Sequence, residues 1–581
     1  MEFRLASAAF IAVFATYLFL GGVGVTDRGN LQPRDSDYNL LARGLLAGHL
    51  YADKDVPPAF RRLPDPYDPA LNQPFRASTA YRLHDLSYFK GRFYLYFGIA
   101  PALLVFIPWH LLTGGWLPLW AAVVFLCSAG LLANLLLVRA VGRRLAPSAP
   151  AWMPAACVLI LGLASYAPLL AARADIWEVP IASSYLAVSV ALLCLWQAHE
   201  NPARSARWLA VASAAFGAAF ASRPTMLPAA AVLLLPFRDG QVRRNPWAWA
   251  AAAAPLCACG LLVALYNALR FGNPFEFGIR YQLANEYVAR LHVFGADQFW
   301  TNVRLYLLQP VQWSAVFPFA HEPDAALLRA HVPLDHGGIE HISGALLNDP
   351  VLWAAFALPA LGCAGRMARG VAAAAVPAAW VSLASLGVLL FFFGSCSRYQ
   401  FEFVPWIALL ACLGVLALEG TLSGTPRTIA RCLWATALAA SCAFTVLYSI
   451  DRCAQDHNSA GFAELAAGNA GSAENDFAIA NRLSPGNPAS RLGVAWMLVG
   501  EGRMGEAEAA YNALLGDFPS YTQAHFSLAN LLRHEGRFDD ALVHYRLAHQ
   551  LEPGNAAMQA ALDSALDKAS AGRGSRRQPV H

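Results

Sequence analysis

The stretch MEFRLASAAFIAVFATYLFLGGVG, residues 1–24, is apolar and long enough to form a helix that spans a bilayer. Directly after it, the chain is polar from about Thr26 to Lys90. This loop carries a series of carboxylates and histidines: Asp35, Asp37, His49, Asp53, Asp55, Asp65, Asp68, His84 and Asp85. The apolar stretch is longer than the core of a signal peptide and no clear cleavage site follows, so we expect a retained signal anchor.

The composition is that of a membrane protein. Hydrophobic residues make up 57% of the chain and charged residues only 14%, whereas soluble domains are about 25% charged. The net charge of +4 is small, and it indicates no nucleic-acid partner. The 11 cysteines lie mostly inside apolar runs, at spacings that match neither a zinc site nor a disulfide framework.

The apolar runs predict an all-α, polytopic bundle of about 11 spans. They lie near residues 5–24, 117–138, 152–172, 184–199, 207–222, 224–237, 247–267, 350–366, 371–393, 402–418 and 428–449. Clusters of arginine, such as Arg139, Arg143 and Arg144, fall on alternate connections, and the positive-inside rule places them in the cytoplasm. The connections 26–93, 173–183, 268–349 and 394–401, and everything after residue 450, are then expected on the outer face.

One apolar segment, residues 94–112, does not fit this alternation. It contains Pro101 and Pro108. If it spanned the bilayer, the arginines at 139–144 would lie outside. We therefore favour a Pro-broken interfacial or re-entrant piece, which lies at membrane depth only where protein or a cavity surrounds it.

The C-terminal region repeats with an offset of 34 residues. Four columns align: Gly468, Gly502 and Gly536; Ala473, Ala507 and Ala541; Phe477, Tyr511 and Tyr545; and Pro485, Pro519 and Pro553. This period and pattern are typical of tetratricopeptide repeats, which stack into an α-helical solenoid and bind proteins or peptides. We expect the membrane domain at residues 1–450, the repeat domain at 455–570, a capping helix near 556–570 and a disordered tail at 571–581.

Two acidic residues near the membrane are the leading catalytic candidates. Asp35 and Asp37 flank Ser36, just before an amphipathic stretch, YNLLARGLLAGHLY. A carboxylate there can act as a general base toward a hydroxyl at the membrane surface. Asp35 can equally be a helix N-cap and Asp37 a first-turn carboxylate, which does not exclude catalysis. The D-x-D string also resembles a metal motif of soluble nucleotide-sugar transferases. The expected topology places this string on the outer face, where nucleotide sugars are absent. We therefore predict no cofactor and no metal ligands, and keep a divalent ion at this pair as an open alternative.

Other ionisable residues at the outer face are candidates for substrate binding, because such groups close to apolar helices are functional by default. They are His84, Asp85, Arg173, Asp175, Glu178, Arg280, Arg398 and Tyr399. An arginine at this boundary can pair with a lipid phosphate through its planar fork, or extend to lipid headgroups. For the remaining residues, interfacial salt bridges and turns are the structural alternative.

Several of these strings resemble one known family. DSDYNLLARGLLAGHLY (35–51), DPYDP (65–69) and HDLSYFKGRFYLYFGIAP (84–101) are similar to the first outer loop of bacterial GT-C membrane glycosyltransferases of the protein O-mannosyltransferase and aminoarabinose transferase group. RADIWE (173–178) resembles that group's second acidic loop, and FASRPT (220–225) and SRYQFEFVP (397–405) resemble its later arginine positions. The resemblance covers about residues 1–420. A membrane core followed by repeats is also similar to eukaryotic TMTC-type O-mannosyltransferases.

The resemblance implies a seven-helix module, a polyprenyl-phosphate-linked sugar donor, an inverting transfer and a catalytic Asp in the first outer loop. Many relatives have adjacent Asp-Glu where this chain has Asp35 and Asp37 separated by Ser36; we favour Asp37 as the base and keep Asp35 as the alternative. Asp175 or Glu178 would orient a substrate. Arg398, with Arg280, would hold the lipid phosphate.

These observations lead to one main hypothesis and two alternatives. The main one is an inner-membrane glycosyltransferase that acts on a protein, envelope glycan or lipid on the outer face, with the repeats on the periplasmic side recruiting a protein. The second is an envelope glycan polymerase or ligase with its site in the loop 268–349, which carries Arg290, His321, His331, His336 and His341. The third is a non-enzymatic scaffold built around the repeats.

Overall fold

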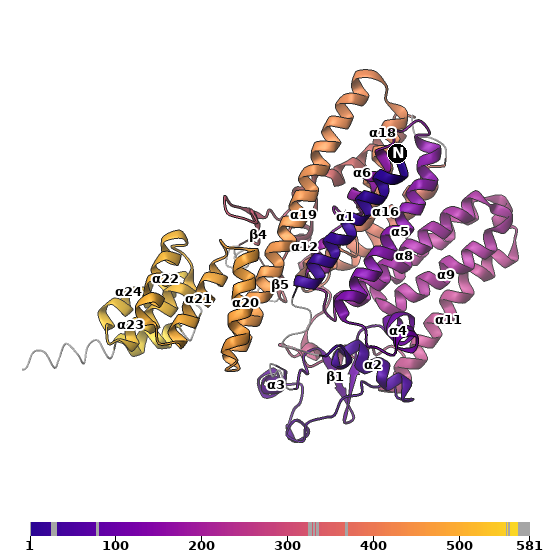
Figure 1. Cartoon of the computed structure of the whole chain (residues 1–581). Coiled ribbons are helices and arrows are strands. Elements are labelled where there is room, and N and C mark those ends of the chain that lie inside the picture. The colour runs from indigo at the N-terminus through magenta and orange to yellow at the C-terminus, as the bar shows by residue number, and fades with distance from the viewer. Residues whose placement is uncertain are drawn as a thin grey trace, which may run out of the picture. The chain divides into compact units, whose positions relative to one another are not determined.

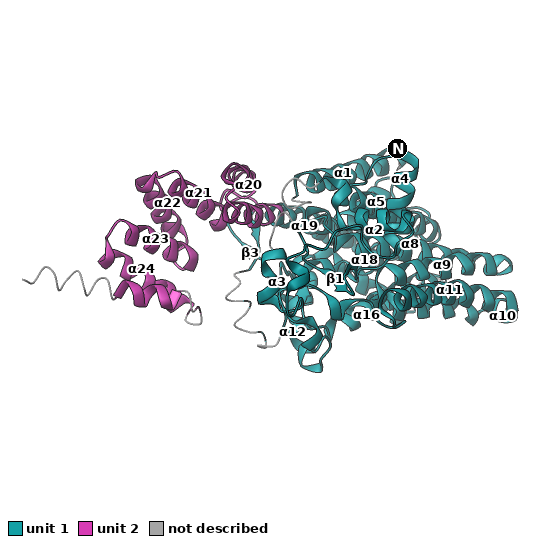
Figure 2. Cartoon of the chain, turned by 90° about the horizontal axis from the view of Figure 1, so that it is seen from below, with its two compact units in different colours: residues 1–314, 319–452 teal, residues 315–318, 453–581 magenta. Residues whose placement is uncertain are grey.

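The computed structural model describes residues 2–24, 32–76, 81–323, 328, 332, 336–365, 370–552, 555 and 558–566. The chain forms two compact units. The first comprises residues 1–314 and 319–452, and the second comprises residues 315–318 and 453–581 (Figure 2). The predicted tail at 571–581, His331 and Pro553 lie outside the described residues.

Seven helices of the described chain are long and apolar enough to cross a membrane. They are α1 (Glu2–Val23), α5 (Leu119–Leu145), α8 (Glu178–Glu200), α11 (Pro246–Phe271), α16 (Ala372–Leu390), α18 (Val404–Thr421) and α19 (Gly424–Ala466). In the first unit, α9 (Ser205–Ser222) packs against both α8 and α11, and α5 packs on the other side of α8 (Figure 1). Small residues permit these close approaches, since a Cβ on Gly130 of α5 would collide with the ring of Tyr185 on α8.

Three of the predicted spans, at 152–172, 224–237 and 350–366, form broken or irregular helices. The segment expected to span at 152–172 breaks into α6 (Met153–Gly162) and α7 (Ala167–Ala172), and Tyr166 between them has a φ of 65°. The segment at 224–237 is η5 (Pro224–Arg238), a 3₁₀-helix with Pro228 and Pro236 inside it. Proline cannot donate the backbone hydrogen bond of a regular α-helix, which accounts for the irregular winding. The segment at 350–366 forms η10 (Pro350–Phe356) and α15 (Ala357–Cys363).

The segment 94–112 contains η3 (Ala102–Phe106), a π-helix, and α4 (Ile107–Thr113). Twelve residues of helix, 102–113, rise about 18 Å at 1.5 Å each. The hydrocarbon core is about 30 Å thick. This length is short for a span, in keeping with the expected interfacial piece.

The loop after α1 is folded. It contains η1 (Pro33–Asp35), α2 (Asp37–Leu46), η2 (Phe60–Arg62), α3 (Pro69–Arg76) and the hairpin of β1 (Leu86–Phe89) and β2 (Arg92–Leu95). Lys90 and Gly91 in the hairpin turn both have positive φ, as a two-residue type I′ turn requires. Ser87 of β1 forms a bridge to Gln282 and donates a 2.9 Å hydrogen bond to the Gly278 carbonyl. The first loop is therefore joined to the loop that follows α11.

That later loop contains short elements: η6 (Ile279–Tyr281), η7 (Val288–Arg290), η8 (Ala296–Gln298), α12 (Phe299–Val303), η9 (Arg304–Leu308), β3 (Gln312–Trp313), β4 (Ala320–His321), β5 (Ile339–Glu340) and α14 (Ala345–Asn348). β5 pairs in parallel with β6 (Ser395–Cys396), so that Glu340 lies opposite Cys396. α17 (Ser397–Gln400) follows β6 directly. This pairing brings the loop after α11 to the connection between α16 and α18.

The second unit is a stack of helix pairs. After the end of α19 it contains α20 (Ala470–Leu483), α21 (Pro488–Gly500), α22 (Met504–Asp517), α23 (Thr522–His534) and α24 (Phe538–Leu551), and residues 558–566 are helical. The aligned glycines Gly468, Gly502 and Gly536 have φ values of 83°, 77° and 80°, the left-handed conformation that ends a helix. The aligned alanines and aromatic residues are buried in the core of the stack. The periodicity predicted this stack of helix pairs correctly.

The sequence placed a boundary between the last apolar helix and the first repeat helix. The two compact units divide between residues 452 and 453, within the predicted interval of 450–455, and this division falls inside one continuous helix, α19, of 43 residues. No proline interrupts the segment SIDRCAQDHNSAGF, residues 449–462, so nothing in it ends the helix.

Candidate active site

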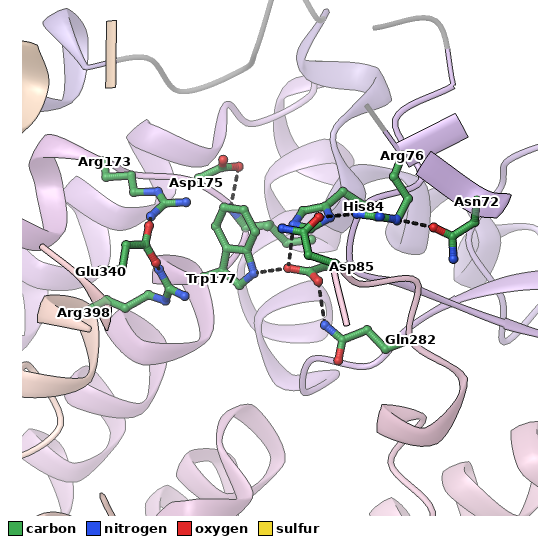
Figure 3. A network of polar contacts seen from close by, with 12 residues as sticks. Asn72, Arg76, His84, Asp85, Arg173, Asp175, Trp177, Gln282, Glu340 and Arg398 are labelled. Carbon is green, nitrogen blue, oxygen red and sulfur yellow. Dashed lines mark hydrogen bonds and ion pairs between the residues drawn. The ribbon is translucent and has the colours of Figure 1, made fainter. Parts of the chain in front are cut away.

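Two arginines of the first unit share one carboxylate. Arg173 follows α7, Arg398 lies in α17, and Glu340 lies in β5. One oxygen of Glu340 pairs with Arg173 and the other with Arg398 (Figure 3). A third guanidinium, that of Arg452 on α19, lies 3.9 Å from Glu340. Three guanidinium groups thus surround one carboxylate, with Glu178 as a further charged neighbour of Arg398, and guanidinium groups are suited to an anionic ligand.

Trp177 lies beside both of these arginines. The guanidinium of Arg173 is 4.6 Å from the ring centroid of Trp177, and that of Arg398 is 5.3 Å away. At these distances each cation is attracted to the ring face. The indole therefore helps to hold the two guanidiniums on either side of Glu340.

Asp85, in the folded loop after α1, anchors Trp177. It accepts hydrogen bonds of 2.6 Å from Nε1 of Trp177 and from Nε2 of Gln282. His84 Nε2 lies 3.6 Å from the same carboxylate. Asp85 is buried and has a φ of 62°. With these donors around it, Asp85 is suited to position other side chains.

Asp35 and Asp37 have different surroundings. Asp35 ends η1, is half exposed, and lies 3.3 Å from Arg43, which also pairs with Asp53 at 2.6 Å. Asp37 begins α2, is partly buried, and lies near Lys54. Burial lowers the pKa of Lys54, while the charges of Asp37 and Asp35 act in the opposite direction. Asp35 is therefore an exposed carboxylate paired with an arginine, whereas Asp37, two residues later, is a partly buried carboxylate near a lysine.

Tyrosines connect the surroundings of Asp37 to the arginine cluster. Tyr38 is buried, and burial raises its pKa, with Asp37 and Arg223 as charged neighbours that act in opposite directions. Burial likewise raises the pKa of Tyr96, which feels Asp85 on one side and Arg398 and Arg223 on the other. The loop after α1, through Tyr38 and Asp85, and Tyr96 directly after β2 thus lie close to the arginines of the later loops.

Arg223 and Glu402 form a separate buried pair. Glu402 pairs with Arg223 and accepts a 3.1 Å hydrogen bond from Thr225. The guanidinium of Arg223 lies 5.4 Å from the ring centroid of Tyr399. Glu402 therefore compensates the charge of Arg223. Arg398, four residues before Glu402, pairs with Glu340 instead.

Asp175 and Glu178 form the start of α8. The backbone N–H of Asp175 donates to Glu178 at 3.1 Å, and that of Ile176 donates to Asp175 at 2.7 Å. Glu178 is buried and lies in the first turn of α8, where the helix dipole favours a negative charge. Their geometry supports a structural role in holding the 173–178 loop that carries Arg173 and Trp177.

Arg280 is not part of the cluster. Its side chain is 74% exposed and lies 3.8 Å from Glu276, and none of its described contacts reaches Glu340 or Trp177. The neighbouring Gln282 makes the connection instead, through Asp85. Three described histidines of the late loop have separate partners: His321 pairs with Asp451 at 2.9 Å, His341 with Glu322 at 2.8 Å, and His336 contacts Asn302 at 3.2 Å.

Sequence reasoning missed several members of this site. Trp177 lies inside the quoted string RADIWE but was not singled out, and Tyr96 was taken only as part of a membrane-bound stretch. Glu340, Lys54 and Arg452 had no distinguishing local pattern, because their roles depend on strand pairing and helix packing far from their neighbours in sequence.

No group of three or more His, Cys, Asp or Glu side chains that could hold a metal ion occurs among the described residues. The described cations near Asp35 are the guanidinium of Arg43, at 3.3 Å, and the amine of Lys54. A divalent ion at Asp35 and Asp37 remains a prediction.

Comparison with known proteins identifies the C-terminal region. A tetratricopeptide repeat family model matches residues 460–522 and 498–556. A search of curated proteins found no match to the chain. Among solved structures, the chain is similar to ArnT from Cupriavidus metallidurans bound to undecaprenyl phosphate, with 12% identity, 84% of this chain and 79% of that chain covered, and a TM-score of 0.41. It is also similar to yeast Tom70, with 13% identity, 71% and 77% covered, and a TM-score of 0.20.

Both TM-scores are low, so the function of the membrane unit has to be argued from its own residues. The repeat helices, their left-handed glycines and the family match agree over one region. Residues 460–556 are tetratricopeptide repeats.

Proposed function

We propose that the first unit is a membrane glycosyltransferase that uses a polyprenyl-phosphate-linked sugar as its donor. The observation that carries this proposal is the pairing of Arg173 and Arg398 with the single carboxylate of Glu340 beside Trp177. Arg173 lies between α7 and α8, and Arg398 lies between α16 and α18. A lipid whose chain lies in the bilayer can therefore present its phosphate to both arginines. Guanidinium forks bind phosphate oxygens in a bidentate manner.

In the proposed reaction, the oxygen of an acceptor hydroxyl attacks the anomeric carbon of the donor sugar. The bond between that carbon and the phosphate oxygen breaks, and the polyprenyl phosphate leaves with the electron pair. Asp37 takes the proton of the hydroxyl, which makes it the general base. Arg173 and Arg398 stabilise the charge that develops on the leaving phosphate. A single displacement of this kind inverts the anomeric centre.

Glu340 would act as an internal substitute for the phosphate. Without a ligand, it compensates the arginines and holds their side chains in place, so little conformational entropy has to be lost when the lipid binds. Its side chain is 32% exposed, so it can turn aside toward water. Asp85 would keep Trp177 in position, and the aromatic ring would border the sugar.

The outer face of an inner membrane is the proposed site of action, with the positive-inside rule as its support. The repeats would recruit a protein acceptor or a partner enzyme.

The alternative of a polymerase or ligase predicted a separate site in the loop 268–349. Two residues of that loop, Gln282 and Glu340, instead contact the first and second outer loops. Its described histidines have separate partners. No observation on these residues favours the alternative.

The test is sugar transfer by the purified full chain, with a synthetic polyprenyl-phosphate sugar as the donor and product detected by mass spectrometry. The matched variants are Arg398→Gln and Arg62→Gln, the second being an exposed arginine of η2 in the first loop. We expect Arg398→Gln to lose transfer and Arg62→Gln to retain it. Equal activity of the two variants would show that the cluster does not hold the donor, and transfer by neither wild type nor variants would favour the scaffold.

A further inference from the structure

A large cavity lies between helices of the first unit, away from the arginine cluster around Glu340. It has a volume of about 990 Å³ and is open along one side, where Leu132 and Leu136 are half exposed. It is formed by α1, α5, α6 and α18, which lie together near the N-terminus in Figure 1. Apolar side chains line most of it, among them Phe10, Leu132, Leu136, Met153 and Leu416. A cavity of this size and lining suits hydrocarbon chains.

One end of the cavity is basic. Arg139 and Arg143 line it, and both come from the last turns of α5. They are four residues apart, on the helix face that also presents Leu132 and Leu136. No aspartate or glutamate is among the residues that line the cavity, and neither arginine forms an ion pair with a described residue.

The neighbouring Arg144 shows the contrast. It pairs with Glu200 at 2.5 Å and lies 5.7 Å from the ring centroid of Trp196. Its charge is therefore compensated inside the protein. Of the three arginines at the end of α5, only the two that line the cavity, Arg139 and Arg143, have a charge that no described acidic residue compensates.

We propose that this cavity binds an anionic phospholipid of the cytoplasmic leaflet. Its acyl chains would fill the apolar part, and Arg139 and Arg143 would hold its phosphate. Basic pockets between membrane helices on the cytoplasmic side are suited to acidic headgroups. The ammonium group of a zwitterionic lipid would meet two arginines and no carboxylate, so a net negative headgroup is favoured.

This site is distinct from the proposed donor site. Met153 of α6 lines the cavity, whereas Arg173 follows α7 at the far end of the same helical segment. If the arginines at 139–144 are cytoplasmic, the two sites lie toward opposite faces of the membrane. A lipid here would bridge α1 to α5 and α6, and α1 leads into the loop that carries Asp37.

The test is native mass spectrometry of the full-length protein in detergent, titrated with phosphatidylglycerol and, separately, with phosphatidylcholine. We expect one phosphatidylglycerol to bind more tightly than the rest. The double variant Arg139→Gln/Arg143→Gln should bind it about thirtyfold more weakly, the effect of two arginines at a membrane surface. Arg144→Gln, which alters a paired arginine outside the cavity, should bind it as the wild type does.

A second variant keeps the charges and fills the space. Leu136→Trp adds volume at a partly exposed position of the lining, so it should also lose the tight lipid while both arginines remain. Wild-type affinity in both the double variant and Leu136→Trp would overturn the proposal. So would equal affinity of the wild type for phosphatidylglycerol and phosphatidylcholine.

Discussion

The indole nitrogen of Trp177 donates a 2.6 Å hydrogen bond to the carboxylate of Asp85. This bond joins two loops that are 92 residues apart in sequence. Trp177 in turn lies beside Arg173 and Arg398. A residue of the loop after α1 thereby fixes the aromatic ring against which the proposed phosphate ligands are held.

The first prediction concerns this bond. Trp177→Phe keeps an aromatic face for the arginines and removes the N–H donor. A hydrogen bond to a charged group contributes about 1.5–3 kcal/mol, so we expect sugar transfer to fall by about ten- to a hundredfold. The rate should be measured at saturating donor. Trp177→Ala should lower the rate further, because it also removes the ring. An unchanged rate in Trp177→Phe would show that the hydrogen bond to Asp85 does not contribute to catalysis.

The second prediction concerns the geometry of the arginine fork. Arg398→Lys retains the positive charge but loses bidentate pairing. We expect weaker donor binding, measured as a rise in KM for the lipid-linked sugar of about tenfold or more. Glu340→Gln should shift KM in the opposite direction, because it removes the internal competitor for the guanidiniums. A rise in KM in both variants would mean that Glu340 orients the donor instead of substituting for it.

The third prediction distinguishes the two acidic residues of the first loop. Asp37 is sheltered beside Lys54, whereas Asp35 is half exposed and paired with Arg43. Asp37→Asn should reduce kcat by about 10²–10⁴-fold, the usual contribution of a general base, with little change in KM. Asp35→Asn is the matched control and should change kcat less than tenfold. The reverse order of effects would assign the base to Asp35.

The fourth prediction concerns Asp349, which immediately precedes η10. Burial raises the pKa of Asp349 to about 8, compared with 3.8 for an unperturbed carboxyl group. Between these values the folded state holds a proton that the unfolded state has released. Stability should therefore fall as pH rises from 3.8 to about 8, by at most about 1.4 kcal/mol per pH unit from this group.

Asp349→Asn keeps the size of the side chain and does not titrate. Thermal unfolding of the full chain in detergent at pH 5–8 should show a flatter dependence for this variant than for the wild type. Parallel curves for the two proteins would show that Asp349 does not titrate in this range.

The fifth prediction concerns a histidine pair of the repeats. Nδ1 of His525 lies 3.0 Å from Nδ1 of His544, and Nε2 of His525 lies 2.9 Å from the Pro519 carbonyl. Nε2 of His525 must donate to that carbonyl, so its Nδ1 accepts, and His544 donates through its own Nδ1. Protonation of His525 would place two N–H groups face to face.

Burial and the neighbouring His525 lower the pKa of His544 from 6.5. As pH falls below 6.5, the unfolded state takes up a proton that the folded state resists. Stability of the repeats should therefore decrease toward acid pH. Hydrogen exchange of α23 and α24 in the full chain, corrected for intrinsic rates, should show faster opening at pH 5.5 than at pH 7.5. His544→Asn, which keeps a donor and does not titrate, should lose this dependence.

Sequence alone was sufficient for the repeats. Their period places Gly468, Gly502 and Gly536 at turns and the aligned alanines in the core, because each repeat uses the same local contacts. The apolar helices were also evident from composition. The interruptions of these helices were harder to predict, because no local pattern in the sequence indicates the positive φ of Tyr166.

The site was predictable only in part. Arg173 and Arg398 were chosen because they lie next to apolar helices, and the structure brings them together on Glu340. Arg280 was chosen for the same reason, yet it is exposed, because a surface arginine and a site arginine look alike in one sequence. Glu340 could not be found, since its role depends on the pairing of β5 with β6.

The proposal that Arg173 and Arg398 hold a lipid phosphate can be tested by measuring the binding of polyprenyl phosphate itself, without a sugar. The purified full chain would be titrated with the lipid at fixed ionic strength, alongside Arg173→Gln/Arg398→Gln and the control Arg62→Gln. We expect saturable binding by the wild type and by the control. The double variant should bind the lipid at least about thirtyfold more weakly, as expected for the loss of two charge-assisted contacts. Equal affinity in all three proteins would contradict the proposal.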